Sequence, residues 1–201
     1  MYICINKVIK TMEKIIKYEL TDDTIVVDGI TLHRIKALKD FSNVKAGDLG
    51  GWIEKENNLS QMDNAWIGGD AKVYGSAKVC CDANVYGNAM VYCDAKVYGN
   101  AMVYDNVKVF EDAEVFGNAE VFGNAEIRGN AEIASNSDYI VFKNWWSSGR
   151  YFTWTKSNNM WKAGCFYGTS NELIEKAYRD SEKSGKEYEK IVKYVESILE
   201  V

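Results

Sequence analysis

The middle of the chain repeats one pattern of small, aliphatic and turn-forming residues every six positions. Each six-residue unit opens with alanine, except at Val107, and an aliphatic residue always follows two positions later, as Val85 follows Ala83. The last two positions are mostly glycine followed by asparagine or aspartate. Alternating side chains are typical of a strand, and residues that tolerate positive φ are typical of a corner. The twelve units over residues 65–134 therefore predict twelve short strands, each followed by a corner.

Short strands with a corner every six residues coil upon themselves instead of pairing as hairpins. Three units make one triangular turn, so twelve units predict four turns of a parallel β-helix. The alanines fit the tight inner corners, and the valines and isoleucines fill the interior. Residues eighteen positions apart then lie above one another. The predicted core is therefore all-β.

The segments before the repeat predict a β-hairpin and an irregular coil. Two alternating runs flank Asp28-Gly29, a dipeptide typical of a two-residue hairpin turn, so residues 21–45 are expected to form a hairpin that caps the solenoid. Residues 46–64 keep glycine-rich corners but lose the six-residue spacing. We expect them to form an irregular first coil.

The sequence changes composition sharply after the repeat. Residues 137–168 carry four of the six tryptophans. Alternating stretches divided near Ser148-Gly149 and near residues 157–159 predict three short antiparallel strands. This part is expected to form an aromatic β segment at the far end of the solenoid.

Two helices are predicted over residues 169–201. Capping boxes place their starts at Thr169, with Glu172, and at Ser184, with Glu187. The second helix has one apolar face, which we expect to pack on the protein itself. This face consists of Tyr188, Ile191, Val192, Val195, Ile198 and Leu199.

Several of these features resemble known families. An aliphatic residue followed four positions later by a small one, as in Val85 and Ala89, resembles the left-handed β-helix of hexapeptide-repeat proteins, the acyltransferases among them. The flanking stretches LHRIKALKDFSNVKAGDLGGWIEKENNLS and GCFYGTSNELI are similar to phage- and prophage-encoded hexapeptide-repeat proteins, most of which have no assigned function. This similarity covers the chain from about residue 17. It implies a left-handed parallel β-helix in a phage or prophage accessory protein.

Composition and charge limit the cellular compartment and the classes of partner that we expect. The net charge of −5 argues against a general affinity for nucleic acid, and no apolar run is long enough to span a membrane. Five cysteines without a framework spacing favour reduced thiols in a cytoplasm, that of the host cell if the gene belongs to a phage. Residues 1–20 form a separate N-terminal segment without a secretory signal. Met12 is an alternative native start, which would make residues 1–11 an extension.

The side chains that catalysis would need are scarce. Acyltransferases of the hexapeptide-repeat kind use a histidine base, and related carbonic anhydrases bind zinc through three histidines, whereas this chain has only His33. Cys81 and Cys93 fall on different corners of the predicted triangle, and the adjacent Cys80 and Cys81 are expected to point in different directions. We therefore expect no catalytic residue, no metal and no cofactor.

Outward-facing aromatic residues are the first candidate binding group. They follow the inner aliphatic residue of most units, and eighteen-residue stacking arranges them in columns. Two interpretations remain open: the columns are covered by the flanking segments, or they bury each other in a homo-oligomer, a dimer or trimer with ligand pockets between subunits. The candidate binding residues are Tyr74, Tyr86, Tyr92, Tyr98 and Tyr104, in columns with Phe110, Phe116 and Phe122.

The aromatic β segment carries the second candidate group. Its tryptophans form either a small core that caps the solenoid or a recognition surface, because Trp, Tyr and Arg dominate binding hot spots. A pocket for a nucleotide base and phosphate is a further alternative. The residues are Trp145, Trp146, Arg150, Trp154 and Trp161.

These observations favour binding over catalysis. We predict a non-enzymatic phage or prophage accessory protein that binds a host protein, such as an inhibitor of a defence system of the anti-CRISPR-like or anti-CBASS-like kind. The alternative is an oligomeric protein that binds nucleotides or other small molecules, or a hexapeptide-repeat acyltransferase. Neither membrane nor nucleic acid is an expected partner.

Overall fold

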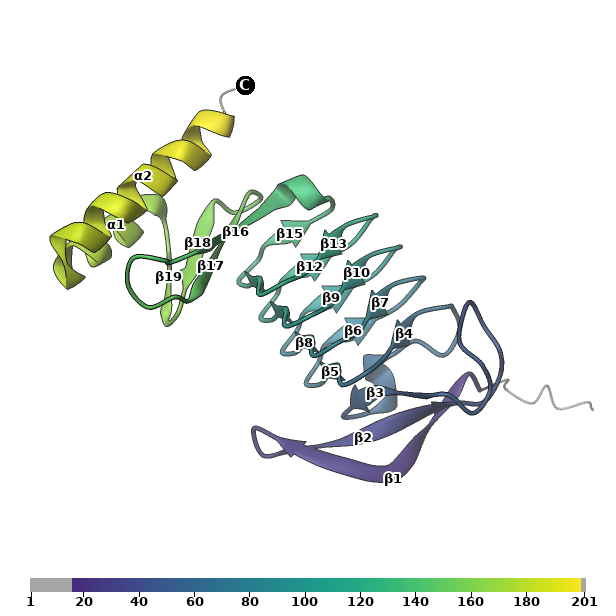
Figure 1. The fold of residues 1–201 in the computed structure, drawn as a ribbon. Helices are drawn as coiled ribbons and strands as arrows, with labels where there is room; N and C mark the ends of the chain where they lie inside the picture. The colour runs from purple at the N-terminus through teal and green to yellow at the C-terminus, as the bar shows by residue number, and fades with distance from the viewer. Residues whose placement is uncertain (1–15, 200–201) are drawn as a thin grey trace, which may run out of the picture.

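The computed structural model describes residues 16–199. Met12 and the proposed extension over residues 1–11 lie outside this range. The β-solenoid forms the middle of an elongated molecule, with a β-hairpin against one end and a small sheet and two helices at the other (Figure 1).

Twelve two-residue strands build the regular solenoid, as the six-residue repeat predicts. They form three parallel sheets in which strands pair eighteen residues apart, so that Met102 lies between Asn84 and Glu120. The strands are β4 (Trp66–Ile67), β5 (Lys72–Val73), β6 (Lys78–Val79), β7 (Asn84–Val85), β8 (Met90–Val91), β9 (Lys96–Val97), β10 (Met102–Val103), β11 (Lys108–Val109), β12 (Glu114–Val115), β13 (Glu120–Val121), β14 (Glu126–Ile127) and β15 (Glu132–Ile133).

The interior of the solenoid is apolar and closely stacked. The alanine and aliphatic positions of the repeat are all buried and belong to one continuous core. Each coil donates its backbone N–H groups to the next coil, as Lys72 donates to the Ala89 carbonyl (2.9 Å) and Tyr74 to the Val91 carbonyl (3.1 Å). Burying an aliphatic side chain contributes ~1.5–3 kcal/mol, so the interior and the backbone ladder stabilise the solenoid together.

The N-terminal end is a hairpin that continues one of the three sheets. Strands β1 (Tyr18–Val27) and β2 (Ile30–Ala37) pair antiparallel around Asp28 and Gly29, both of which have positive φ, as the turn prediction requires. Strand β2 then pairs antiparallel with β3 (Leu49–Ile53), and β3 pairs parallel with β5. The hairpin therefore covers the sheet edge that the solenoid would otherwise expose.

An irregular first coil adds a fifth turn to the four regular ones, as predicted for the segment before the repeat. Ile53 of β3 pairs with Val73, the short helix η1 (Glu56–Asn58) follows, and Leu59 bridges to Val79. Asn58 replaces strand pairing here, because its buried amide donates to the Ala77 carbonyl at 2.9 Å.

The C-terminal sheet has four antiparallel strands, one more than predicted. They are β16 (Tyr139–Lys143), β17 (Tyr151–Thr155), β18 (Met160–Ala163) and β19 (Phe166–Gly168), and the short helix η2 (Asn136–Asp138) leads into them. The missed strand, β19, is only three residues long and follows a two-residue turn at Gly164-Cys165.

Side chains beyond the repeat satisfy N–H groups of the last coil. Glu120 N donates to Asn136 Oδ1 (2.7 Å), Glu126 N to Thr153 Oγ1 (3.0 Å) and Glu132 N to Ser157 Oγ (2.7 Å). Each donor belongs to a different sheet of the solenoid. The end of the solenoid nearest the C-terminal sheet is thus closed by single polar side chains rather than by another strand.

Two helices, α1 (Ser170–Asp180) and α2 (Glu182–Leu199), follow the C-terminal sheet. The predicted capping box at Thr169 is confirmed. The second start was wrong: α2 begins at Glu182, and Ser181 Oγ accepts the N–H of Ser184 (3.1 Å), so the cap lies three residues earlier. Within residues 16–199, no helix is long and apolar enough to cross a membrane.

The hydrophobic side of α2 packs into a second core that α2 shares with the C-terminal sheet and α1. Val192 and Val195 are buried in this second core, and Tyr188 and Ile191 pack against it. Ile198 and Leu199 stay exposed, so the last turn extends past the sheet. The prediction that this face packs on the protein itself is confirmed except at its end.

Glycine at position 50 is required by the crossing of β3 over the first regular coil. A Cβ atom there would lie 2.5 Å from Ile35 Cγ1 and 2.6 Å from the Ile67 carbonyl oxygen. Gly68 is a matched control, because a Cβ there would meet nothing closer than 3.7 Å. We expect Gly50→Ala to lower the free energy of unfolding by about 2–3 kcal/mol and Gly68→Ala to change it by less than about 1 kcal/mol. Urea unfolding measures the free energy of both variants, and an equal loss of stability in the two would contradict this packing.

Lys17 anchors the hairpin to the first coil from a buried position. Its ammonium donates to the Asp63 carbonyl (3.0 Å) and the Ala65 carbonyl (2.7 Å), and it lies 3.8 Å from a carboxylate oxygen of Asp63. Burial lowers the pKa of Lys17 from 10.5 to about 8, although the Asp63 carboxylate opposes this shift.

This pKa predicts a pH dependence of stability. Between pH 8 and 10.5 the unfolded chain binds more protons at Lys17 than the folded chain does, so the free energy of unfolding rises with pH in this window. Between pH 7.5 and 9.5, the free energy of unfolding measured with urea should increase by about 1–2 kcal/mol more in the natural chain than in Lys17→Met. Identical pH profiles for the two chains would contradict this assignment.

Candidate binding surface on the solenoid

The outward aromatic residues stack in the columns that the eighteen-residue spacing predicts. Tyr74, Tyr92 and Phe110 form one column, with ring centroids 5.2 and 5.0 Å apart. The other stacked pairs have centroid distances of 5.0 to 5.5 Å and are Tyr86–Tyr104, Tyr104–Phe122 and Tyr98–Phe116. The three columns differ in what surrounds them.

The column at Tyr74 is covered at both ends by the flanking segments. Tyr74 is buried, and its hydroxyl donates to the Asp28 carboxylate in the hairpin turn (3.3 Å). At the other end the Arg128 guanidinium lies between the rings of Phe110 (5.5 Å) and Tyr167 (4.9 Å). This column therefore links the hairpin, the solenoid and the C-terminal sheet.

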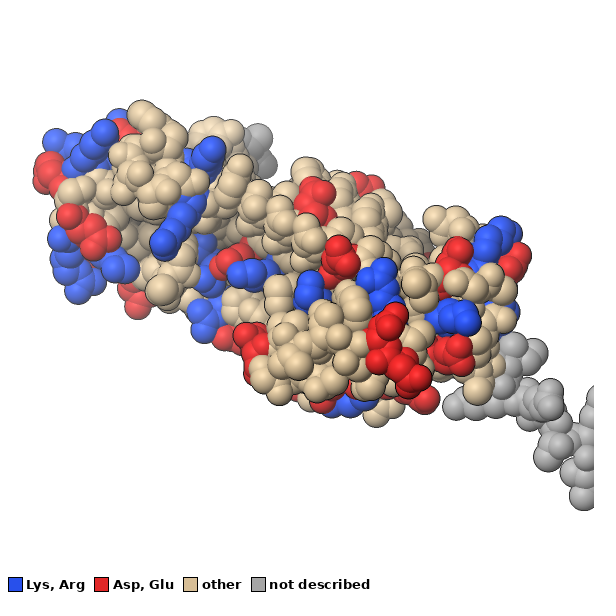
Figure 2. All heavy atoms as spheres, turned by 60° about the horizontal axis from the view of Figure 1, so that its bottom comes forward, with Lys and Arg blue, Asp and Glu red and all other residues tan. Residues whose placement is uncertain are grey.

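The column at Tyr98 lies beside charged residues. The Tyr98 hydroxyl donates to Glu114 Oε2 (2.8 Å), and the Lys96 ammonium lies 2.7 Å from the other oxygen of the same carboxylate. The hydrogen bonds from Lys96 and Tyr98 lower the pKa of Glu114. Lys108 and Glu126 form a second ion pair between coils (3.5 Å). Both pairs join a lysine of one coil to a glutamate of the next coil. Positive and negative side chains lie close together over the surface in Figure 2.

The third column belongs to a face that lacks basic residues. We name it the apolar face and define it as the outward side chains of β4, β7, β10 and β13 with the residue that follows each strand. It consists of Trp66, Gly68, Asn84, Tyr86, Met102, Tyr104, Glu120 and Phe122.

The six-residue units that build the apolar face contain no lysine or arginine. These units are residues 65–70, 83–88, 101–106 and 119–124. The units of each other face contain at least two basic residues. Along the apolar face, Tyr86 is 39% exposed and Phe122 46% exposed. An uncovered strip of stacked rings therefore follows the solenoid on this face.

A cavity lies at each end of the apolar face. The cavity beside the hairpin has a volume of about 620 Å³ and is lined by Val44, Leu49, Trp66, Tyr86 and Met102 with several polar residues. The cavity beside the C-terminal sheet has a volume of about 520 Å³, and its lining includes Phe122, Tyr139, Ile140, Val141 and Tyr151. Neither lining contains lysine, arginine or histidine. Both cavities suit apolar groups better than phosphates.

The tryptophans of the aromatic β segment lie mostly inside the protein. Trp146, Trp154 and Trp161 are buried in the second core, whereas Trp145 is 71% exposed and Arg150 is exposed as well. The core that caps the solenoid accounts for the three buried rings. Only Trp145 and Arg150 of this group are available to a partner.

The residues considered for catalysis and metal binding are dispersed. His33 lies on β2, and its Nδ1 is 3.2 Å from the Thr21 carbonyl oxygen within the hairpin. Across residues 16–199, no three His, Cys, Asp or Glu side chains are grouped as a metal ion would need. The expectation that Cys80 and Cys81 point apart was wrong, because their sulfur atoms lie only 3.6 Å apart.

Comparison with known proteins supports the repeat and covers little of the chain. The YdcK β-solenoid repeat family matches residues 95–109. The protein named uncharacterized acetyltransferase YdcK, from Escherichia coli (strain K12), is 46% identical over 39 residues. This match covers 19% of the present chain and 12% of the Escherichia coli protein. The chain is thus similar to part of a β-solenoid, over a fraction of that relative's length.

Proposed function

We propose that this protein works by binding a partner protein on its apolar face and is not an enzyme. The exposed column of Tyr86, Tyr104 and Phe122 carries this proposal, together with the cavity at each end of it. Contiguous exposed apolar surface of this kind is typical of interaction sites. Tyrosine, tryptophan and phenylalanine also bury large areas in an interface at a small cost in side-chain entropy.

Charge around the apolar face favours a partner with lysine or arginine at its rim. Asp70, Asp82 and Asp105 are exposed on the corners beside this face, and Glu120 lies on it. Arg34 is 3.5 Å from Asp70, which neutralises part of this charge. Two copies of the face would oppose acid to acid. A homo-oligomer, the dimer or trimer predicted from the sequence, would therefore use another surface.

The biological setting of the proposal comes from the resemblance of the flanking sequences to phage and prophage proteins. In that setting the partner is a host protein, and inhibition of a defence system is the role we propose. A solenoid suits such a role because its backbone ladder fixes the spacing of the exposed rings before binding. Preorganisation of this kind lowers the entropic cost of association.

Acyl transfer is the second candidate, because the Escherichia coli protein matched over 39 residues is named an uncharacterized acetyltransferase. A CoA thioester has phosphate groups that need cationic partners, and the two cavities of the apolar face contain none. His33 contacts a backbone carbonyl of its own hairpin. These two observations rank acyl transfer, and nucleotide binding at these cavities, below protein binding.

Two substitutions at one position test the binding face. Met102→Lys and Met102→Glu remove the same apolar contact, and only the lysine repels a basic partner rim. We expect a host protein captured by the natural chain to bind Met102→Lys at least tenfold more weakly than Met102→Glu in calorimetry, a difference of about 1.4 kcal/mol. Lys78→Glu, on another face, is the control and should leave affinity within about twofold. Equal binding of all four chains would contradict the proposal.

A ligand screen tests the second candidate. Acetyl-CoA and nucleotides at millimolar concentration should leave the melting temperature of the natural chain unchanged, since a true ligand at 100 times its Kd adds ~2.7 kcal/mol. Stabilisation by acetyl-CoA that disappears in His33→Ala would instead favour acyl transfer.

A further inference from the structure

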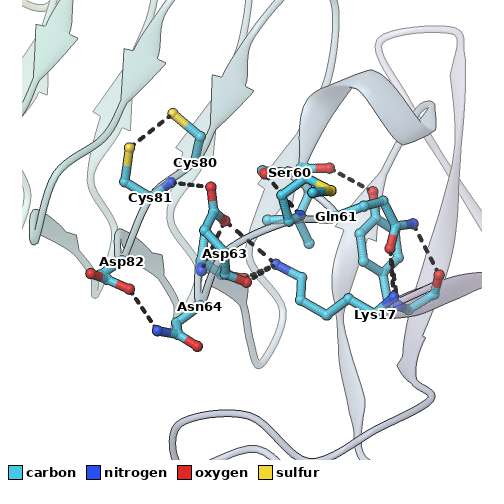
Figure 3. A network of polar contacts seen from close by, with 12 residues as sticks. Lys17, Ser60, Gln61, Asp63, Asn64, Cys80, Cys81 and Asp82 are labelled. Atoms are coloured by element: carbon cyan, nitrogen blue, oxygen red, sulfur yellow. Dashed lines mark hydrogen bonds and ion pairs between the residues drawn. The ribbon is translucent and has the colours of Figure 1, made fainter. Parts of the chain in front are cut away.

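Two neighbouring cysteines at one corner of the solenoid hold their thiols face to face. The sulfur atoms of Cys80 and Cys81 lie 3.6 Å apart (Figure 3). Consecutive residues of a strand point to opposite sides, but Cys81 occupies the corner with a φ of +65°. The left-handed backbone turns its side chain back towards Cys80. The close pair is therefore a property of the corner.

The coil below holds this corner in place. The N–H of Cys81 donates to Asp63 Oδ2 (2.7 Å), and the other carboxylate oxygen of Asp63 lies 3.8 Å from the buried ammonium of Lys17. Asn64 donates to the Asp82 carboxylate (2.8 Å) on the next residue of the corner. In Figure 3, Asp63 and Lys17 lie beside the two cysteines, and Asn64 and Asp82 lie below them. The backbone that carries the thiols is fixed before any ligand arrives.

The pair is open to solvent and adjoins a cavity. Cys81 is exposed and Cys80 half-buried. Cys80 lines a cavity of about 440 Å³ whose other lining residues are mostly polar, Ser60 and Lys78 among them. A small organic group attached to a centre held by both sulfurs has room there.

The sulfur separation suits one centre bound by both thiolates. Two sulfurs bound at ~2.3 Å to a tetrahedral centre lie ~3.8 Å apart. The narrower bond angles of a pyramidal trivalent centre bring two bound sulfurs closer together than this, towards the 3.6 Å observed. A zinc site needs three or four protein ligands, and the described residues offer no third one here. A monosubstituted trivalent arsenic needs only two sulfurs, because its organic substituent is the third group.

We propose that Cys80 and Cys81 form a binding site for monosubstituted trivalent arsenicals. Two As–S bonds form, two As–OH bonds break, and the two thiol protons leave with the hydroxyl groups as two water molecules. Arsenic stays trivalent throughout, and no oxidant or reductant takes part. The proposal is independent of the partner-binding function.

The proposed site does not depend on an unusually reactive single thiol. Burial is the largest influence that raises the pKa of Cys80, to about 11, so at neutral pH it is a protonated thiol and a poor nucleophile. Cys93 and Cys165 are exposed single thiols elsewhere on the surface. Selectivity for the pair would come from the geometry of two sulfurs, which an alkylating reagent does not sense.

Phenylarsine oxide and the full chain test the proposal. Intact mass spectrometry should detect one phenylarsenic group on the natural chain and on Cys93→Ser/Cys165→Ser, retained in millimolar glutathione and released by 2,3-dimercaptopropanol. Cys80→Ser and Cys81→Ser should each bind at least 100-fold more weakly, with unchanged circular dichroism.

Cys4 is present in every variant and so cannot account for the difference between them. Retention of the phenylarsenic group by Cys80→Ser, or its loss from Cys93→Ser/Cys165→Ser, would overturn the proposed site. Failure of the natural chain to bind would overturn it as well, and none of these results bears on the apolar face.

Discussion

The hydrogen-bond ladder between successive coils is the constraint on which the whole structure depends. Each coil donates its N–H groups to the carbonyls of the next, and this fixes the pairing of residues eighteen positions apart. Side chains of the same type must then stack upon each other, inside and outside. The alanine positions, the valine interior and the aromatic columns are three consequences of one spacing. Corners with positive φ let the chain turn without breaking the ladder.

A ladder has two ends, and each end is closed differently. The hairpin closes the first one by continuing a sheet, and buried Lys17 ties it to the first coil through backbone carbonyls. Side chains of the C-terminal region close the other, as Thr153 does for the N–H of Glu126. Both devices prevent another chain from adding to the ladder. The second core under α2 is a separate packing unit that the solenoid supports.

The repeat made the solenoid and its columns predictable, because one spacing determined register, interior and stacking together. Features set by local turns were harder to predict. Strand β19 is too short to show an alternating pattern, and one residue, Ser181, separates α1 from α2, so the capping box at Ser184 was misleading. The contact of Cys80 with Cys81 was missed because strand alternation was applied across a left-handed corner. Which column stays uncovered depends on the flanks, which no repeat describes.

The apolar face therefore follows from where the flanking segments pack: they cover the column at Tyr74 and leave that at Tyr104 open. Methyl NMR of methionine gives the most direct test of binding there, because Met102 lies on this face and Met90 on the neighbouring sheet of β8. Titration with the proposed partner protein should shift or broaden the Met102 methyl signal and leave that of Met90 in place. A shift of Met90 alone, with Met102 unchanged, would contradict the account.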